Sequence, residues 1–108
     1  MQNDILKKIA GILETRKRAD PETSYVASLY SAGINTVLKK VGEEATEVVI
    51  AGNSGDKDAI IHETADLWFH TLVMLAQCGL GPEDILNELD RRFGRSGLEE
   101  KANRQKPE

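Results

Sequence analysis

The sequence predicts an all-α protein, an antiparallel bundle of about five helices that forms a single domain over residues 1–108. Three observations support this fold class. Apolar residues recur at the three- and four-residue spacing of an α-helix, no stretch shows the alternation of a half-buried strand, and glycine or proline falls at the expected helix ends. No repeat or long linker divides the chain, and 108 residues can bury one core.

The first two predicted helices are short. Asn3 or Asp4 can cap the first one, which should fade before Pro21 because proline disfavours helical geometry in the residue that precedes it. A second helix is expected over residues 24–33, where Gly33 is suited to the C-cap position.

Two longer helices follow. The third should cover residues 34–52, and a Gly-Asn-Ser-Gly turn at residues 52–55 should separate it from a fourth helix over residues 58–77, which Asp56 or Asp58 can cap. Because the turn is short, the two helices should be antiparallel neighbours. The later half of the fourth helix is apolar on nearly every side, which is typical of a helix buried in a bundle or a dimer.

The last part of the chain begins at a glycine-rich break. Gly79 and Gly81 should end the fourth helix, and Pro82 is suited to the first position of a fifth. A further helical piece is expected over residues 98–104, and residues 105–108 resemble a frayed tail.

The composition is that of a globular protein, with 40% hydrophobic and 30% charged residues. A net charge of −4 argues against a nucleic-acid or membrane-surface binder. No apolar run approaches the roughly 20 residues of a membrane span, and the N-terminus lacks the pattern of a secretory signal, so we expect a cytoplasmic protein. The single cysteine, Cys78, excludes an internal disulfide and is expected to be a small buried apolar residue.

Two pairs of acids carry the functional prediction. Glu44 and Glu47 lie three residues apart on the third helix, as do Glu63 and Asp66 on the fourth, and residues at this spacing share a helix face. A single pair of this kind usually lies on a solvated face. Two pairs on neighbouring antiparallel helices, each beside a strong apolar stripe, would instead take up protons or bind a cation. An all-oxygen set suits Mg²⁺, Mn²⁺ or Ca²⁺. Glu43 points away from the apolar stripe and should face solvent or a partner chain.

Other polar residues have two interpretations. His70 continues the strip of Glu63 and Asp66, where it could contact a substrate or bond a backbone or carboxylate group. Three basic residues near the chain end could close over an anionic ligand or could form a solvated basic helix end; these are Arg92, Arg95 and Lys101. A di-iron site is disfavoured, because it would pair a glutamate with a histidine three residues later, and neither of the two long predicted helices has that spacing.

The acidic motif leads to a family resemblance. EEATE at residues 43–47, followed by ETAD at residues 63–66, resembles the EExxE…ExxD signature of the all-α nucleoside triphosphate pyrophosphohydrolases. More narrowly, SYVASLYSAG, KKVGEEATE, ETADLWFHTLVML and SGLEEKANR are similar to the phosphoribosyl-ATP pyrophosphohydrolase family of histidine biosynthesis. The resemblance covers about residues 24–104.

The resemblance implies an activity and an assembly. It implies hydrolysis of phosphoribosyl-ATP to phosphoribosyl-AMP and pyrophosphate, an early step of L-histidine biosynthesis, with Mg²⁺ or Mn²⁺ as cofactor. It also implies a homodimer in which pairing of two chains completes a four-helix-type core. No cyclohydrolase half is present, so the stand-alone form is expected.

The resemblance also implies roles for individual residues. The metal ligands and catalytic acids would be Glu44, Glu47, Glu63 and Asp66, with Glu43 as an auxiliary acid. Lys39 and Lys40, which precede Gly42 by three and two residues, are similar to the family's basic residue and are candidate phosphate contacts.

Two rival functions stay open from the sequence. One is a house-cleaning nucleoside triphosphate pyrophosphohydrolase of the same superfamily, which would act on damaged or deoxy nucleotides. The other is a non-catalytic helical dimerisation module whose acids are merely solvated. Product analysis separates the first rival. A test for stabilisation by Mg²⁺ plus nucleotide separates the second.

Overall fold

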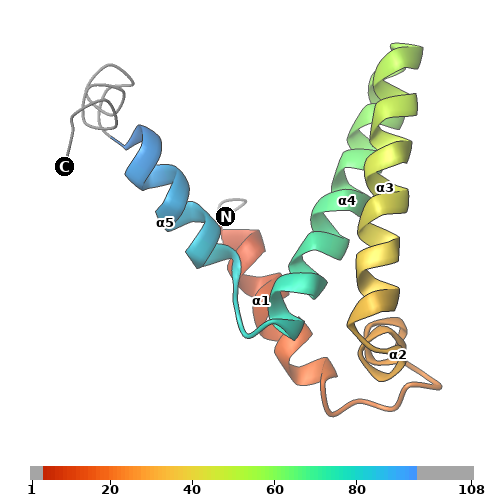
Figure 1. Ribbon diagram of the computed structural model, residues 1–108, viewed down its shortest axis with the longest axis vertical. Coiled ribbons are helices and arrows are strands. Elements are labelled where there is room, and N and C mark those ends of the chain that lie inside the picture. Colours follow the sequence, from red (N-terminus) through yellow and green to blue (C-terminus); the bar gives the residue numbers. More distant parts are fainter. Residues whose placement is uncertain (1–3, 95–108) are drawn as a thin grey trace.

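The computed structural model describes residues 4–94, and these residues confirm the all-α prediction. The described part of the chain contains no strand and forms five α-helices: α1 Ile5–Arg16, α2 Tyr25–Ala32, α3 Ile34–Ser54, α4 Lys57–Gln77 and α5 Pro82–Phe93 (Figure 1). The expected cap Asn3, the helical piece after Gly97 and the tail at residues 105–108 lie outside the described residues.

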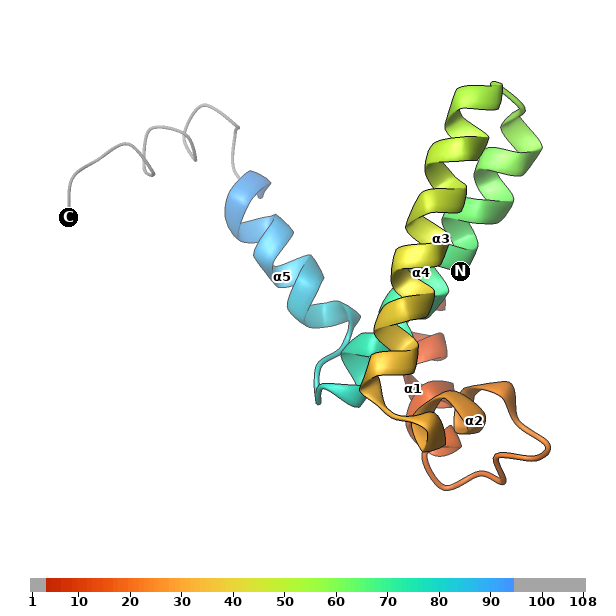
Figure 2. The same cartoon turned by 45° about the vertical axis from the view of Figure 1, so that its right-hand side comes forward.

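Helices α3 and α4 form a long antiparallel hairpin, which is the main structural unit. They lie side by side along most of their length in both views (Figures 1 and 2). At the turn, Gly55 adopts the left-handed conformation with φ 76°, which costs glycine little. The Oδ1 atom of Asp56 then accepts the backbone N–H groups of Asp58 at 3.1 Å and Ala59 at 3.3 Å, capping α4 as predicted.

The end of α3 differs from its predicted position. We expected the turn to begin at Gly52, but α3 continues to Ser54. One glycine within a helix costs only about 1 kcal/mol, which continued backbone hydrogen bonding can offset. The Ser54 hydroxyl donates to the Ala51 carbonyl at 2.7 Å, and the single left-handed residue of this turn is Gly55. The turn is therefore tighter than predicted, which brings the two helices together directly.

The core lies at the end of the hairpin where α3 begins and α4 ends, and α1 and α2 pack there (Figure 1). Ser24 caps α2 by accepting the Ala27 N–H at 3.2 Å, and Gly33 ends it with φ 97°, both as predicted. The Tyr30 hydroxyl donates to the Leu13 carbonyl at 3.0 Å and ties α2 to α1. The buried residues of the core are Leu13, Val26, Leu29, Val37, Leu72, Val73, Leu75 and Ala76.

Helix α5 begins as predicted and diverges from the hairpin in both views (Figures 1 and 2). Pro82 occupies its first turn, and the Gly81 N–H donates to Asp84 Oδ2 at 2.9 Å. The apolar stripe of α5 is exposed in the single chain, as are several large apolar residues of the hairpin. Cys78 is also exposed, at the C-cap of α4, so its predicted burial is wrong: it lies just beyond the last buried turn. Among the described residues, no helix combines the length and apolar character that a membrane span requires.

Candidate functional site

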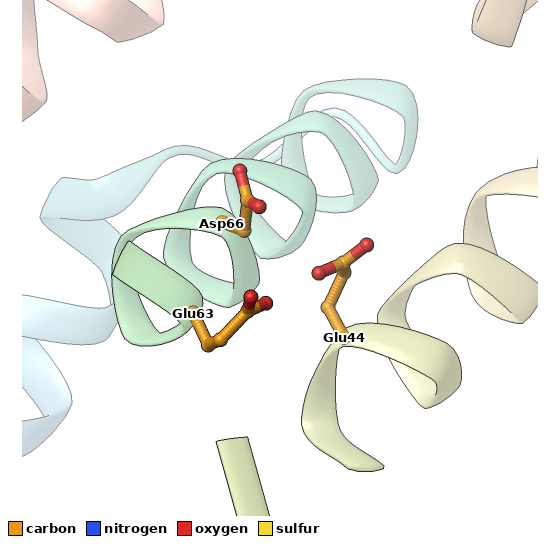
Figure 3. Close-up of side chains that lie close together, drawn as sticks. All are labelled: Glu44, Glu63 and Asp66. Carbon is orange, nitrogen blue, oxygen red and sulfur yellow. The ribbon is translucent and has the colours of Figure 1, made fainter. Parts of the chain in front are cut away.

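Three of the predicted acids meet across the hairpin. Glu44 projects from α3 toward Glu63 and Asp66 on α4 (Figure 3). One carboxylate oxygen from each residue lies within 4.8 Å of the other two. We call these three residues the carboxylate cluster. They are partly buried, and the side chain of Glu44 is only 12% exposed. Because the acids come from two helices, the cluster exists only when the hairpin is formed.

The fourth predicted acid does not join the cluster. Residues three apart on a helix differ by about 300°, so Glu47 is rotated by about 60° from Glu44. The side chain of Glu47 is accordingly exposed on α3. Glu63 and Asp66 are rotated relative to each other by the same angle, yet both reach Glu44. The metal-binding role of Glu47 stays a prediction, as does that of Glu43, which is also exposed.

Few cationic groups lie beside the cluster. Lys40 Nζ lies 3.7 Å from Glu44 Oε1, one helical turn away, and Lys39 is exposed. His62 Nε2 lies 3.6 Å from Asp66 Oδ2 and adds a positive charge only when it is protonated. His62 was not identified from the sequence, although its position four residues before Asp66 on one helix was a usable signal. Around the cluster, the described residues therefore hold more negative than positive charge.

His70 is buried within the fold and is not exposed beside the carboxylate cluster. It is the one buried polar residue among residues 4–94, at 5% exposure. Its Nδ1 lies 2.8 Å from the backbone oxygen of Asp66, and its Nε2 lies 2.8 Å from the hydroxyl of Tyr25 on α2. Phe69 and Tyr25 pack edge-on against the ring. Both ring nitrogens are thus engaged within the protein, which matches the structural alternative considered for His70. Tyr25 was not identified from the sequence.

The predicted basic residues near the chain end fall into two groups. Arg92 lies on α5, where its Nε donates to Glu88 Oε2 at 2.8 Å. Arg91 donates to both oxygens of the same carboxylate, and the hydrogen bonds from Arg91 and Arg92 lower the pKa of Glu88 to about 2. Arg95 and Lys101 lie outside the described residues. A substrate contact from these three predicted residues stays a prediction.

Comparison with known proteins identifies related sequences. Residues 6–93 match the family described as phosphoribosyl-ATP pyrophosphohydrolase. A phosphoribosyl-ATP pyrophosphatase of Methylococcus capsulatus is 61% identical over 101 residues, covering 94% of this chain and 96% of that protein. A phosphoribosyl-ATP pyrophosphatase of Hydrogenovibrio crunogenus is 56% identical over 98% of this chain and 97% of its own length. The whole carboxylate cluster falls within the matched residues.

Proposed function

The chain belongs to the phosphoribosyl-ATP pyrophosphohydrolase family, and we propose that it hydrolyses phosphoribosyl-ATP to phosphoribosyl-AMP and pyrophosphate in L-histidine biosynthesis. The structural observation that supports this proposal is the carboxylate cluster, which lies on the two central helices of the matched region. Carboxylates gathered in this way suit a reaction on a polyphosphate held through a cation.

We propose that Glu44, Glu63 and Asp66 hold Mg²⁺, or Mn²⁺ in its place. Hard carboxylate oxygens are the ligands that these ions prefer. Opposite ligands of Mg²⁺ are about 4.2 Å apart, since each bond is about 2.1 Å. Three ligands of an octahedral ion include at least two adjacent pairs, which are about 3.0 Å apart. The cluster oxygens lie within 4.8 Å of one another, so movements of about 1 Å by each side chain would bring them to this spacing. Glu47 would need a larger rotation to become a fourth ligand.

A cation bound in the cluster would neutralise charge on the substrate phosphates and acidify a coordinated water. The chain itself would orient the substrate and accept a proton. Lys40, with Lys39, would contact the phosphates, since Lys40 already lies beside Glu44. Water would attack the α-phosphorus, forming one P–O bond. The bond to the bridging oxygen would break, with pyrophosphate leaving with the electron pair. A carboxylate of the site would accept the proton of the water.

We also propose that the protein is a homodimer of the cytoplasm. The single chain leaves large apolar residues exposed on α5, among them Ile85, Leu89 and Phe93, and others on the hairpin, such as Trp68, whose exposed fraction is 59%. Exposed apolar surface of this kind favours burial against a second copy. Light scattering coupled to size exclusion should report twice the mass of the chain, and a monomer at all concentrations would contradict this part of the proposal.

The experiment that tests the proposed function is release of pyrophosphate from phosphoribosyl-ATP, with Mg²⁺ and with EDTA. We expect release only with the cation, and phosphoribosyl-AMP as the second product. A panel of ordinary, deoxy and oxidised nucleoside triphosphates serves as the comparison. Faster turnover of a panel member would favour the house-cleaning rival, and no turnover of any compound would favour the non-catalytic module.

A further inference from the structure

A short chain of hydrogen bonds connects α2 to the turn of α4 that carries Asp66. The Tyr25 hydroxyl meets His70 Nε2 at 2.8 Å, and His70 Nδ1 meets the Asp66 backbone oxygen at 2.8 Å. A carbonyl oxygen can only accept, so Nδ1 must carry the hydrogen and donate it. In the neutral ring, Nε2 is then the acceptor, and the Tyr25 hydroxyl donates to it. The geometry therefore assigns the hydrogen of Nδ1 and, for the neutral ring, the donation from the Tyr25 hydroxyl to Nε2.

These hydrogen bonds reach Asp66 through its backbone oxygen and do not involve its carboxylate. The His70 ring bonds the carbonyl four residues earlier on its own helix, and side-chain bonds of this type compete with the helical hydrogen bond and adjust the local backbone. The Asp66 carboxylate extends from the same residue into the cluster with Glu44 and Glu63. The position of the Asp66 carboxylate therefore depends on the orientation of the His70 ring, which the hydrogen bond from Tyr25 holds in place.

Tyr25 is well placed for this task. It is the first residue of α2, directly after the cap Ser24, and α2 packs chiefly against α3. Since Glu44 lies on α3 and Asp66 on α4, a bond from α2 to α4 couples the two helices that share the cluster. Tyr25 is itself 52% exposed, so loss of its hydroxyl removes a hydrogen bond with little change in packing.

We propose that Tyr25 and His70 are positioning residues for the carboxylate cluster. They fix the α4 turn at Asp66, and so set the affinity of the cluster for a divalent cation without belonging to it. This inference rests on the proposed function to the extent that the cluster binds a cation.

The test compares Tyr25→Phe with Tyr30→Phe. Both substitutions remove one hydroxyl from α2, and both hydroxyls donate a hydrogen bond to another helix. The Tyr30 hydroxyl, however, donates to Leu13 on α1, which has no part in the cluster. Affinity for Mn²⁺ alone is measured by calorimetry, without substrate. Groups that orient ligands from outside typically change metal affinity about 10-fold to 100-fold, and we expect the lower end, about tenfold, for Tyr25→Phe. We expect less than about twofold for Tyr30→Phe.

Two further readouts separate positioning from a general loss of stability. Both variants should lower the midpoint of urea unfolding by similar amounts. In the steady state, excess cation should restore the kcat of Tyr25→Phe, because its catalytic groups are intact. ¹⁵N NMR should show the Nδ1–H tautomer of His70 in the unsubstituted protein, whether or not a cation is bound.

The outcomes distinguish this inference from the proposed function. Equal Mn²⁺ affinity in the two variants, with normal binding by the unsubstituted protein, would overturn the positioning role and leave the cation site standing. The Nε2–H tautomer would overturn the assigned hydrogen bonds directly. Absence of Mn²⁺ binding by the unsubstituted protein would remove the proposed cation site, and the positioning role with it.

Discussion

Replacement of Glu63 by glutamine should stabilise the metal-free protein while removing its response to Mg²⁺. Among the described residues, Glu63 is the member of the carboxylate cluster that has no ion pair, whereas Glu44 lies near Lys40 and Asp66 near His62. Glutamine keeps nearly the same shape and deletes one charge. The substitution therefore removes two repulsive pairs without breaking an attractive one.

The separation of the carboxylates sets the magnitude. At 4.8 Å, two like charges repel by about 0.9 kcal/mol in bulk water and by about 3.5 kcal/mol at an effective dielectric constant of about 20. The cluster is only partly buried, so solvent screening places the value near the lower limit. Two pairs then amount to about 2 kcal/mol, which raises the Tm of a domain of this size by about 8 °C or more.

The assay is thermal and urea unfolding, first in EDTA and then in Mg²⁺, at one protein concentration because dimerisation would make Tm depend on it. With Mg²⁺ at 100 times its Kd, the unsubstituted protein should gain about 2.7 kcal/mol, and Glu63→Gln should gain much less. Glu22→Gln is the matched control, because it removes the same charge from an exposed position between α1 and α2. Destabilisation of Glu63→Gln in EDTA would contradict the repulsion within the carboxylate cluster, and an undiminished response to Mg²⁺ would contradict the cation site.

Three other predictions follow from the hydrogen bonds and turns of the fold. Tyr30→Phe should lose about 0.5–1.5 kcal/mol of stability, measured by urea unfolding at neutral pH, with the loss of its bond to Leu13. Burial, followed by the charge of Glu14, raises the pKa of Tyr30 above 10.0. The contribution of Tyr30 to the free energy of unfolding is therefore complete below pH 10 and falls as the pH rises through the folded-state pKa. This fall should be absent in Tyr30→Phe. Glu88 has its pKa lowered from 4.5 to about 2 by hydrogen bonds from Arg91 and then Arg92, so its contribution is present above pH 4.5 and is lost as the pH falls toward 2. Glu88→Gln should flatten acid unfolding in that window, and an unchanged acid limb followed by circular dichroism would contradict this assignment. Gly55→Ala should cost about 1–2 kcal/mol, because alanine is strained at φ 76°, and a neutral result in urea unfolding would show that the turn relaxes.

Much of the fold could be predicted from the sequence because the residues that begin and end its helices act locally. Ser24, Gly33, Asp56 and Pro82 act on groups within a few residues of themselves, and the structure places each at the predicted helix end. Gly52 was misleading for the same reason. Glycine is common both at helix ends and in tolerated interior positions, and only the backbone conformation at Gly55 distinguishes the two cases.

The candidate site was less predictable because it depends on two helices together. Helical periodicity placed Glu44 and Glu47 on one flank but could not determine which of them faces α4. The exposure of Glu47 depends on the rotation of α3 about its own axis. The bond from Tyr25 to His70 spans 45 positions along the chain, and a contact of that range has no local sequence signal. The exposure of Cys78 was equally hard to predict, because this residue lies just beyond the last buried turn of α4.

Asp66, as part of the carboxylate cluster, should be needed for hydrolysis of phosphoribosyl-ATP. The direct measurement is the rate of pyrophosphate release by Asp66→Asn in saturating Mg²⁺, with circular dichroism to confirm that the helices remain. Loss of a group that holds a catalytic cation or orients a reacting group should lower kcat by at least about 100-fold. A correctly folded Asp66→Asn protein that turns over phosphoribosyl-ATP at a near-normal rate would contradict this role of Asp66.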